Sequence, residues 1–427
     1  MKIILRYPAA LLIVLLSLLS QACSGNKKPG EITAGTIITA DLEASIGKGN
    51  IVDLSSVVSE IEYIPLETSE TSLVGNVLNI YFENRMFFLS MEHVKNLQIF
   101  DIKGNHICYF NRSGRGPEEY SMAINADILP GTGNIAITQY NRNVNVYDPS
   151  GKFLNEFKIP SDNRFKVEPV IFVNDSTCAG IIFESYREKT EYVAVIFAPG
   201  DTVFKFHFPA PYFQTKEPDY NFRLSKPKSK TLRFFKPIGA GTIMYRYNGQ
   251  ARFFFYSNDT IFSVNADKKI ETPYVIKFGK TRPESIVGVS PCKYAEIIGP
   301  LLESDDFLFL YIQLYDNAHE SFENEVMLSD GKIYRYKETS CYALLNKKTG
   351  YFTLLNQPEK GVLGLREDIL NGPPFWPKYL SSTGELVSFC SAEGLISWAE
   401  NHKVSPKLKR IIEKLDENDN PVMILAK

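Results

Sequence analysis

The stretch NLQIFDIKGNHICYF, residues 96–110, decides the fold, because it recurs as NVNVYDPSGKFLNEF at residues 143–157. The two stretches align without a gap, so that Asp101 and Gly104 match Asp148 and Gly151. In each stretch, alternating apolar residues lie on both sides of an Asp-x-x-Gly turn, which is the pattern of a β-hairpin. The sequence therefore contains a repeated hairpin.

Weaker copies of this hairpin follow along the chain. They are VAVIFAPGDTVFKFHF ending at Phe208, IFSVNADKKIETPYVIKF ending at Phe278, CYALLNKKTGYFTLL ending at Leu355 and YLSSTGELVSF ending at Phe389. Six hairpins at this spacing predict six four-stranded units, and such units bury both of their faces when they stack around an axis. We therefore expect an all-β fold, a six-bladed β-propeller.

The propeller is expected to span residues 51–427. EIEYIPLE (60–67) and PVMILAK (421–427) are both strand-like, and we expect them to complete one shared blade that closes the ring. Insertions are expected in the later blades. The candidates are the basic stretch 217–236, the acidic stretch 303–330 and a short helical segment at 395–415 near the C-terminus.

The composition supports a folded protein and excludes one class of partner. Apolar residues make up 44% and charged residues 22% of the 427, which is ordinary globular usage. Lys and Arg number 47 against 49 Asp and Glu, a net charge of -2, so the protein has no basic surplus to neutralise a phosphate backbone. Nucleic acid is therefore not expected as a partner.

The N-terminus has the layout of a secretory signal. Lys2 and Arg6 precede an apolar run at 9–19, and Cys23 directly follows Ala22, as in a lipobox. We predict a lipoprotein signal peptide at 1–22, lipidation of Cys23 and an acylated flexible tether at 23–50. Two alternatives stay open at this point: an uncleaved signal anchor, and a secreted protein that is cut before a structural Cys23.

The remaining cysteines do not form a recognisable site. Cys108, Cys178, Cys292, Cys341 and Cys390 are odd in number and lack the spacing of metal ligands. Cys108, Cys178 and Cys390 lie in apolar strand-like runs, where a free cysteine behaves as a small buried hydrophobe. A single disulfide between two of the five remains an alternative.

Several motifs resemble those of a known family. IPLETSETSLVGNV, NRSGRGPEEY, NGPPFWPKY and the closing ENDNPVMILAK are similar to the NHL-like six-bladed β-propeller lipoproteins common in Bacteroidetes. The resemblance spans residue 51 to the end and implies the fold and the membrane anchor, but it supplies no reaction. In lipoproteins of this type an acidic run after the cysteine is associated with surface display. Lys27 and Lys28 stand there instead, so we expect the periplasmic face of the outer membrane, with surface display as the alternative.

The sequence offers little catalytic chemistry. It contains no nucleophile elbow, no phosphate-binding loop and no dinucleotide-binding glycine motif. The string His319-Glu320-Ser321-Phe322-Glu323 has glutamate where a zincin has its second histidine. We therefore predict no cofactor, no metal site and no catalytic residue. A three-histidine site assembled from distant blades stays open.

Three residues are the predicted binding residues. Arg115 and Tyr120 lie in the Ser113–Tyr120 joint, where the backbone turns into an inner strand, and Trp376 lies in the proline-stiffened GPPFWP loop. We expect the three to approach one rim of the ring, where a guanidinium and an indole would contact a ligand. The alternative for each is a purely structural role.

These features favour a lipid-anchored cell-envelope propeller. It is expected to act as a non-enzymatic binding or scaffold protein whose partner is a protein or a glycan of the envelope. An enzyme, a lyase or hydrolase that acts on a glycan or peptide at the channel mouth, is the alternative, because propellers carry both kinds of function.

Overall fold

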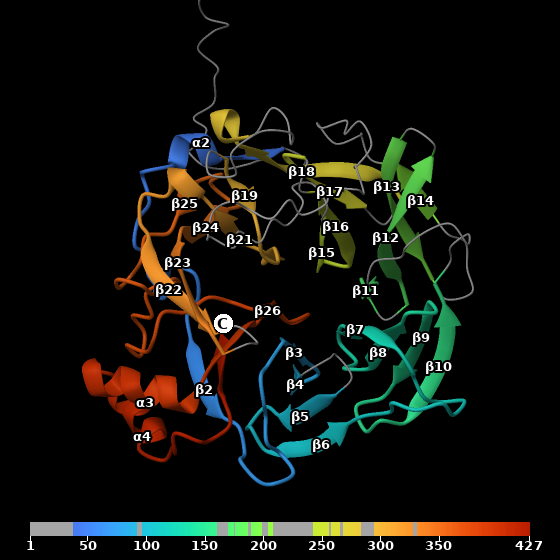
Figure 1. Cartoon of the computed structure of the whole chain (residues 1–427), viewed down its shortest axis with the longest axis horizontal. Coiled ribbons are helices and arrows are strands. Elements are labelled where there is room, and N and C mark those ends of the chain that lie inside the picture. Colours follow the sequence, from blue (N-terminus) through green and yellow to red (C-terminus); the bar gives the residue numbers. More distant parts are fainter. Residues whose placement is uncertain are drawn as a thin grey trace, which may run out of the picture.

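The protein forms a ring of six small β-sheets around a central axis (Figure 1). The computed structural model describes residues 37–91, 96–159, 170–174, 176–186, 189–198, 204–207, 242–255, 258–264, 268–282, 294–327 and 331–427. The expected six-bladed β-propeller is confirmed.

Each blade is an antiparallel sheet whose first strand lies nearest the axis, and we number the blades in sequence order. Blade one is β3 (Asn79–Glu83), β4 (Met86–Ser90), β5 (Leu97–Asp101) and β6 (His106–Phe110), and blade two is β7 (Ala123–Ile128), β8 (Ile135–Gln139), β9 (Asn143–Tyr147) and β10 (Phe153–Lys158). Blade three is β11 (Ile171–Phe172), β12 (Cys178–Tyr186), β13 (Lys189–Phe197) and β14 (Phe204–His207), and blade four is β15 (Thr242–Tyr247), β16 (Gln250–Phe255), β17 (Thr260–Val264) and β18 (Ile270–Lys277). Blade five is β19 (Glu296–Ile297), β20 (Leu302–Glu303), β21 (Phe307–Gln313), β24 (Ser340–Asn346) and β25 (Phe352–Leu354), and blade six is β26 (Tyr379–Leu380), β27 (Leu386–Cys390), β28 (Val422–Ala426) and β2 (Ile61–Pro65).

The two ends of the propeller meet in blade six, as predicted. Strand β28 lies between β27 and β2, and the β2 pairing runs from Ile61 opposite Ala426 to Pro65 opposite Val422. Every residue of β28 is buried. Because β28 and β2 come from opposite ends of the ring-forming sequence, their pairing holds the ring closed.

The repeated hairpins have the turn that the sequence predicts. The Asp101 carboxylate accepts backbone N–H groups of Lys103 and Asn105 at 2.8 and 2.9 Å, and Gly104 has φ of 85°. This left-handed conformation favours glycine. The first five hairpins are outer strand pairs, but YLSSTGELVSF is the inner pair β26–β27. Blade six takes its outer pair from the two ends of the ring, so this blade has no copy of the outer hairpin.

The propeller begins before residue 51. Strand β1 (Ile38–Asp41), in the segment predicted as a tether, pairs in parallel with β18 at the outer edge of blade four. The helical turn α2 (Leu42–Ser45) follows, and Asn50 then forms a bridge with Leu355 beside blade five. The signal peptide and Cys23 lie outside the described residues.

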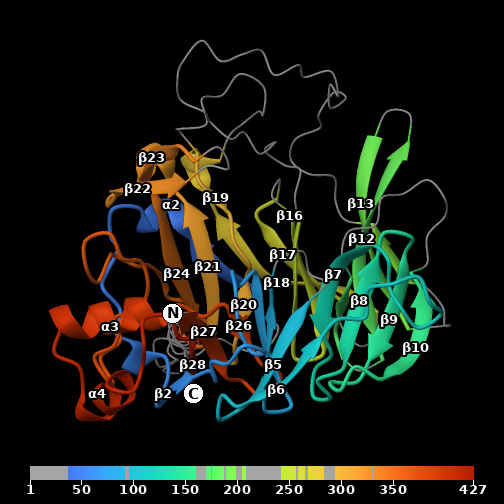
Figure 2. The same ribbon diagram turned by 60° about the horizontal axis from the view of Figure 1, so that its bottom comes forward.

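The insertions differ in part from those predicted. The stretch 303–330 is not one insertion, since Glu303 is buried in the core and β21 is a blade strand. The inserted element is the hairpin of β22 (Phe322–Met327) and β23 (Ile333–Glu338). The stretch 217–236 lies outside the described residues. Figure 2 shows the β22–β23 and β12–β13 hairpins rising on the same side of the ring.

The predicted C-terminal helical segment forms two helices, α3 (Ala392–Asn401) and α4 (Pro406–Ile412). Ser391 and Ser405 cap them by accepting the backbone N–H groups of Gly394 and Leu408. Within the described residues, no helix is both long and apolar enough to cross a membrane.

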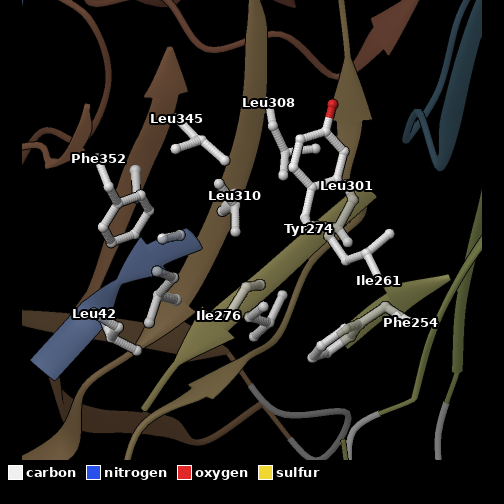
Figure 3. Packing of buried hydrophobic residues seen from close by; sticks show 14 of the residues in the cluster. Leu42, Phe254, Ile261, Tyr274, Ile276, Leu301, Leu308, Leu310, Leu345 and Phe352 are labelled. Atoms are coloured by element: carbon white, nitrogen blue, oxygen red, sulfur yellow. The ribbon is translucent and has the colours of Figure 1, made fainter. Parts of the chain in front are cut away.

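The hydrophobic core lies between adjacent blades. Between blades four and five, for example, Ile261 and Ile276 pack near Leu310 and Leu345, and Leu42 of α2 covers the same cluster (Figure 3). All five side chains are fully buried. Burial of one such side chain stabilises a fold by about 1.5–3 kcal/mol. The blades are therefore fixed relative to one another, and the ends of the inner strands hold constant positions.

Candidate functional site

The inner strands define two faces of the ring. The inner strands β3, β7, β11, β15, β20 and β26 all run in the direction from one face of the ring, which we call the upper rim, toward the other, the lower rim. The β12–β13 and β22–β23 hairpins connect second and third strands of their blades, so they belong to the upper rim (Figure 2). The loops before the inner strands and the turns after them differ in their chemistry.

Near the lower rim, an arginine links several blades at the axis. Arg246 of β15 donates to both carboxylate oxygens of Asp127 of β7, at 3.2 and 3.3 Å, and to the carbonyl of Phe172 at 2.8 Å. It also donates to the Tyr379 hydroxyl of β26 at 2.8 Å. Burial opposes the charge, but the Asp127 carboxylate raises the pKa of Arg246 above its usual range. Arg246 therefore connects blades two, three, four and six.

A glutamate extends this network to blade one. Glu83, at the end of β3, accepts the Tyr379 hydroxyl at 2.8 Å and the backbone N–H groups of Ser382 and Gly131 at 3.0 and 3.1 Å. It also accepts the Ser382 hydroxyl. Burial, followed by the Glu83 and Asp127 carboxylates, raises the pKa of Tyr379 well above its usual range, so its phenol stays protonated. Arg246, Asp127, Tyr379 and Glu83, which we call the axial network, thus join blades four, two, six and one, and the Phe172 carbonyl adds blade three.

A second charged cluster joins blade five to blade four. Glu303 of β20 accepts the hydroxyls of Tyr245 and Tyr274 at 3.0 and 2.7 Å. It also pairs with Arg252 at 3.2 Å and Lys347 at 3.0 Å. A buried carboxylate with four donors is well satisfied, so we interpret this cluster as structural.

The upper rim carries exposed apolar side chains. Leu78, directly before β3, is 51% exposed, and Met122 and Ile124 at the start of β7 are 59% and 38% exposed. Tyr140 is 73% exposed, and its backbone N–H donates to the Met122 carbonyl at 2.9 Å. We call these four residues the apolar rim cluster. In the described part of the lower rim, the turns after the inner strands, such as Asn84-Arg85 and Asn248-Gly249, expose no large hydrophobic side chain.

Lys378 lies directly before β26, and its backbone N–H donates to the Val387 carbonyl at 2.8 Å, so it stands at mid-height of the blade-six inner strand. Its side chain is exposed, and its amine lies 4.1 Å from the centre of the Phe389 ring. No carboxylate among the described residues pairs with it. The surrounding protein lowers the pKa of Lys378 by desolvation, and no acidic group opposes that shift.

Residues 37–427 match the family described as Domain of unknown function (DUF4934). The chain belongs to the DUF4934 family. No curated protein matches it. The six-bladed propeller that the NHL-like resemblance implies is confirmed by the structure, whereas the lipoprotein part of that resemblance stays a prediction.

Solved structures resemble this DUF4934 protein in fold. A Bacteroides fragilis NCTC 9343 protein described as exported is 15% identical with a TM-score of 0.52, and the match covers 92% of this chain and 99% of that one. A Bacteroides vulgatus protein of the DUF4221 family is 13% identical with a TM-score of 0.49, over 88% and 98% of the two chains. At 15% identity, the match to the Bacteroides fragilis protein shows a shared fold and nothing more.

The first two predicted binding residues of the DUF4934 protein lie in a hydrogen-bonded joint. Tyr120 is fully buried between blades one and two, and its hydroxyl accepts the backbone N–H of Arg112 at 3.2 Å. Arg115 is exposed at the tip of the joint, and the Glu119 carboxylate holds the turn by accepting the Gly116 N–H at 2.7 Å. The binding roles of Arg115 and Tyr120 remain predictions.

Trp376, the third predicted binding residue, packs against blade five. Its ring stacks on Tyr342 at 4.0 Å between centroids and 6° between planes, and it meets Phe309 edge-on at 5.5 Å. The side chain is partly buried, so a ligand would reach only part of the indole, and its binding role also remains a prediction.

In the described ranges, no three residues of the His, Cys, Asp and Glu types gather as metal ligands.

Sequence reasoning on this DUF4934 protein missed Lys378 and Arg246. Lys378 lies inside the NGPPFWPKY motif, two residues after the predicted Trp376, so proximity to a predicted site residue could have indicated it. Arg246 lies in an apolar and aromatic strand, IMYRY, where a lone arginine signals a buried partner. Its partners come from other blades, and no local pattern identifies them.

Proposed function

We propose that this protein is a lipid-anchored, exported cell-envelope propeller that binds a protein partner through its upper rim. The observation that carries the proposal is the exposure of Leu78, Met122, Ile124 and Tyr140 on that rim. Several exposed apolar side chains on one rim of a folded domain favour a contact surface.

The opposite rim supports the choice of face. The axial network lies across the lower part of the ring axis with donors and acceptors that are satisfied within the protein, and the described turns that follow the inner strands there expose no large hydrophobic side chain. A partner gains more free energy by covering apolar surface than by displacing water from satisfied polar groups. The projecting β22–β23 hairpin adds Val326, Met327 and Ile333, which are 45%, 71% and 55% exposed, to the upper rim.

The envelope location rests on the sequence. Cys23 follows a signal-like apolar run, and its acylation would hold the protein at a membrane. The similar Bacteroides fragilis protein is described as exported, which agrees with this proposal. We place the protein on the periplasmic face of the outer membrane, with surface display as the alternative outcome.

The binding proposal is tested by site-specific photo-crosslinking in cells. A photoreactive amino acid at Tyr140 is expected to give one defined adduct, and the same residue at Thr132, exposed on the lower rim, serves as the matched control. Met122→Asp should abolish the Tyr140 adduct while the protein stays folded, since Met122 is exposed. An adduct formed equally from Thr132, or one that persists in Met122→Asp, would contradict the proposal.

A further inference from the structure

We infer that the base of the β22–β23 hairpin carries an aromatic site that receives an arginine side chain of the protein partner. This inference rests on the proposed function and adds the chemistry that the partner presents. The site consists of Tyr311, Tyr336, Glu338, Tyr342 and Trp376, which we call the aromatic cluster.

The members of the aromatic cluster are connected by ring contacts and hydrogen bonds. Tyr311 near the end of β21 lies directly opposite Tyr342 near the start of β24, and their ring centroids are 4.9 Å apart. Trp376 stacks on Tyr342 at 4.0 Å. The Ser340 hydroxyl donates to the Tyr311 hydroxyl at 2.9 Å, and the Ser340 N–H donates to the Glu338 carboxylate at 2.9 Å. The cluster therefore continues from blade five onto the hairpin.

Strand β23 contributes two side chains to the cluster. Tyr336 and Glu338 lie on the same face of this strand because they are two residues apart. Burial, followed by the Glu338 carboxylate, raises the pKa of Tyr336. Burial, Tyr311 and Glu338 together raise the pKa of Tyr342 above its usual range. The carboxylate thus acts on rings of both strands, and the phenols stay neutral.

The aromatic cluster has a negative charge without a counter-ion. Oε1 of Glu338 accepts the backbone N–H groups of Thr339 and Ser340, both at 2.9 Å. No lysine or arginine of the described residues pairs with Glu338, whereas Arg335 on the opposite face of β23 pairs with Glu325 at 3.2 Å. The faces of aromatic rings are also negative. A cation would therefore be attracted by the carboxylate and by the rings together.

A guanidinium group fits this site better than a compact ammonium group. Its plane stacks on aromatic rings, and its fork of N–H groups can donate to two acceptors at once. Within the described residues, neither Oε2 of Glu338 nor the Tyr342 hydroxyl has a hydrogen-bond partner. Because all five side chains are half-buried, water screens the attraction less than on an open surface.

The aromatic cluster lies on the side of the ring where we propose the contact with the partner. The β22–β23 hairpin joins β21 to β24 and projects from the upper rim (Figure 2). Arginine is enriched at the centres of protein interfaces, where it fills pockets lined by aromatic side chains. The expected partner therefore presents an arginine to the base of this hairpin.

The test uses N-acetyl-arginine amide as the probe, because it offers the guanidinium on a single residue. Trp398→Phe leaves Trp376 as the only tryptophan of the chain, so the fluorescence of that protein reports on the aromatic cluster. Titration at constant ionic strength should give a saturable change in the Trp376 emission. N-acetyl-citrulline amide has nearly the same shape without the charge, and it should give no such change.

Variants in the Trp398→Phe protein assign the binding to the cluster. Glu338→Gln should weaken arginine binding about tenfold, the size expected for loss of one charge-assisted hydrogen bond. Tyr336→Leu should weaken it about threefold through loss of a cation–π contact. Glu323→Gln is the matched control, because it removes a carboxylate from the opposite face of the same hairpin and should leave binding unchanged.

The same variants link the probe to the partner. In cells, Glu338→Gln should reduce the yield of the adduct formed from Tyr140, and Glu323→Gln should not. Equal arginine affinity with and without Glu338→Gln, equal binding of the citrulline probe, or an absence of arginine binding would overturn the inference. If the Tyr140 adduct still depends on Met122 in any of these cases, only the arginine site is rejected. Loss of rim specificity in the crosslinking itself would instead reject the proposed function.

Discussion

Arg246 and Asp127 form an ion pair between blades that are not neighbours: the guanidinium of blade four reaches past blade three to both oxygens of the blade-two carboxylate, at 3.2 and 3.3 Å. Their side chains are only 18% and 8% exposed. The pair therefore crosses the interior of the ring, and the stability of the ring should depend on it.

We expect Arg246→Met to destabilise the protein by about 3–5 kcal/mol, because it leaves Asp127 buried without its counter-ion. The free energy of unfolding in urea measures this change. Arg115→Met, which removes an exposed arginine, is the matched control and should change stability by less than about 0.5 kcal/mol. Similar values for the two variants would show that the axial network does not hold the blades.

Leu425→Ala should weaken the closure of the ring. Leu425 lies in β28 and is 1% exposed, so its truncation leaves a cavity at the junction of blades six and one and should cost about 2–5 kcal/mol. Leu154→Ala in the outer strand β10, where the side chain is 44% exposed, is the control. Equal thermal midpoints for the two variants would argue against closure through β28.

The end of α3 should respond to pH through His402. Its ring lies 2.6 Å from the Glu359 carboxylate and 2.9 Å from the Trp398 carbonyl, and the Trp398 carbonyl and Glu359 raise the pKa of His402 above 6.5. Because the folded pKa is raised, the stabilisation is complete below pH 6.5 and is lost as pH rises through the folded value. Hydrogen exchange of the last turn of α3 should therefore be faster at about pH 8.5 than at about pH 5.5, after correction for intrinsic rates. Glu359→Gln should reduce the difference, and an unchanged difference would contradict the assignment.

The lipid anchor is tested at Cys23. Cys23→Ala should abolish labelling by a radioactive fatty acid and release the protein from the membrane fraction, because no thioether-linked lipid can then form at that position. Ser24→Ala is the control and should keep both properties. Membrane retention of the Cys23→Ala protein would show that another segment anchors it.

The membrane face is a separate prediction. Protease added to intact cells should leave the protein uncut, since we expect it to face the periplasm. Permeabilised cells provide the control, in which the same protease should cleave the protein. Digestion in intact cells would place the protein on the surface.

The sequence was sufficient for the parts of the fold that rest on local patterns. The Asp-x-x-Gly turns at Asp101 and Asp148 predicted hairpins correctly, because a turn and its two strands lie close together in the sequence. YLSSTGELVSF has the same local pattern but lies at the inner edge of its blade. Its position depends on the pairing of β28 with β2, which no local signal specifies.

The candidate site was less predictable than the fold. The axial network depends on contacts between residues far apart in the sequence, such as Glu83 with Ser382, and hydrophobic periodicity carries no information on them. Lys378 illustrates the same limit, because a lysine at the start of a strand usually lies in solvent with no special neighbour. Its unmatched charge appears only when the blades are assembled around it.

The N-terminal segment also determines how the ring would bear a mechanical load. This segment pairs with the outer edge of blade four through β1, touches blade five at Asn50 and enters blade six as β2. It thus forms a strap around three consecutive blades before the first complete blade begins. A pull applied from the N-terminal side, as an anchored protein would experience in a moving envelope, reaches β1 first and the closing strand pair last. The ring could therefore lose the outer part of its strap under tension while the β2–β28 pairing stays intact.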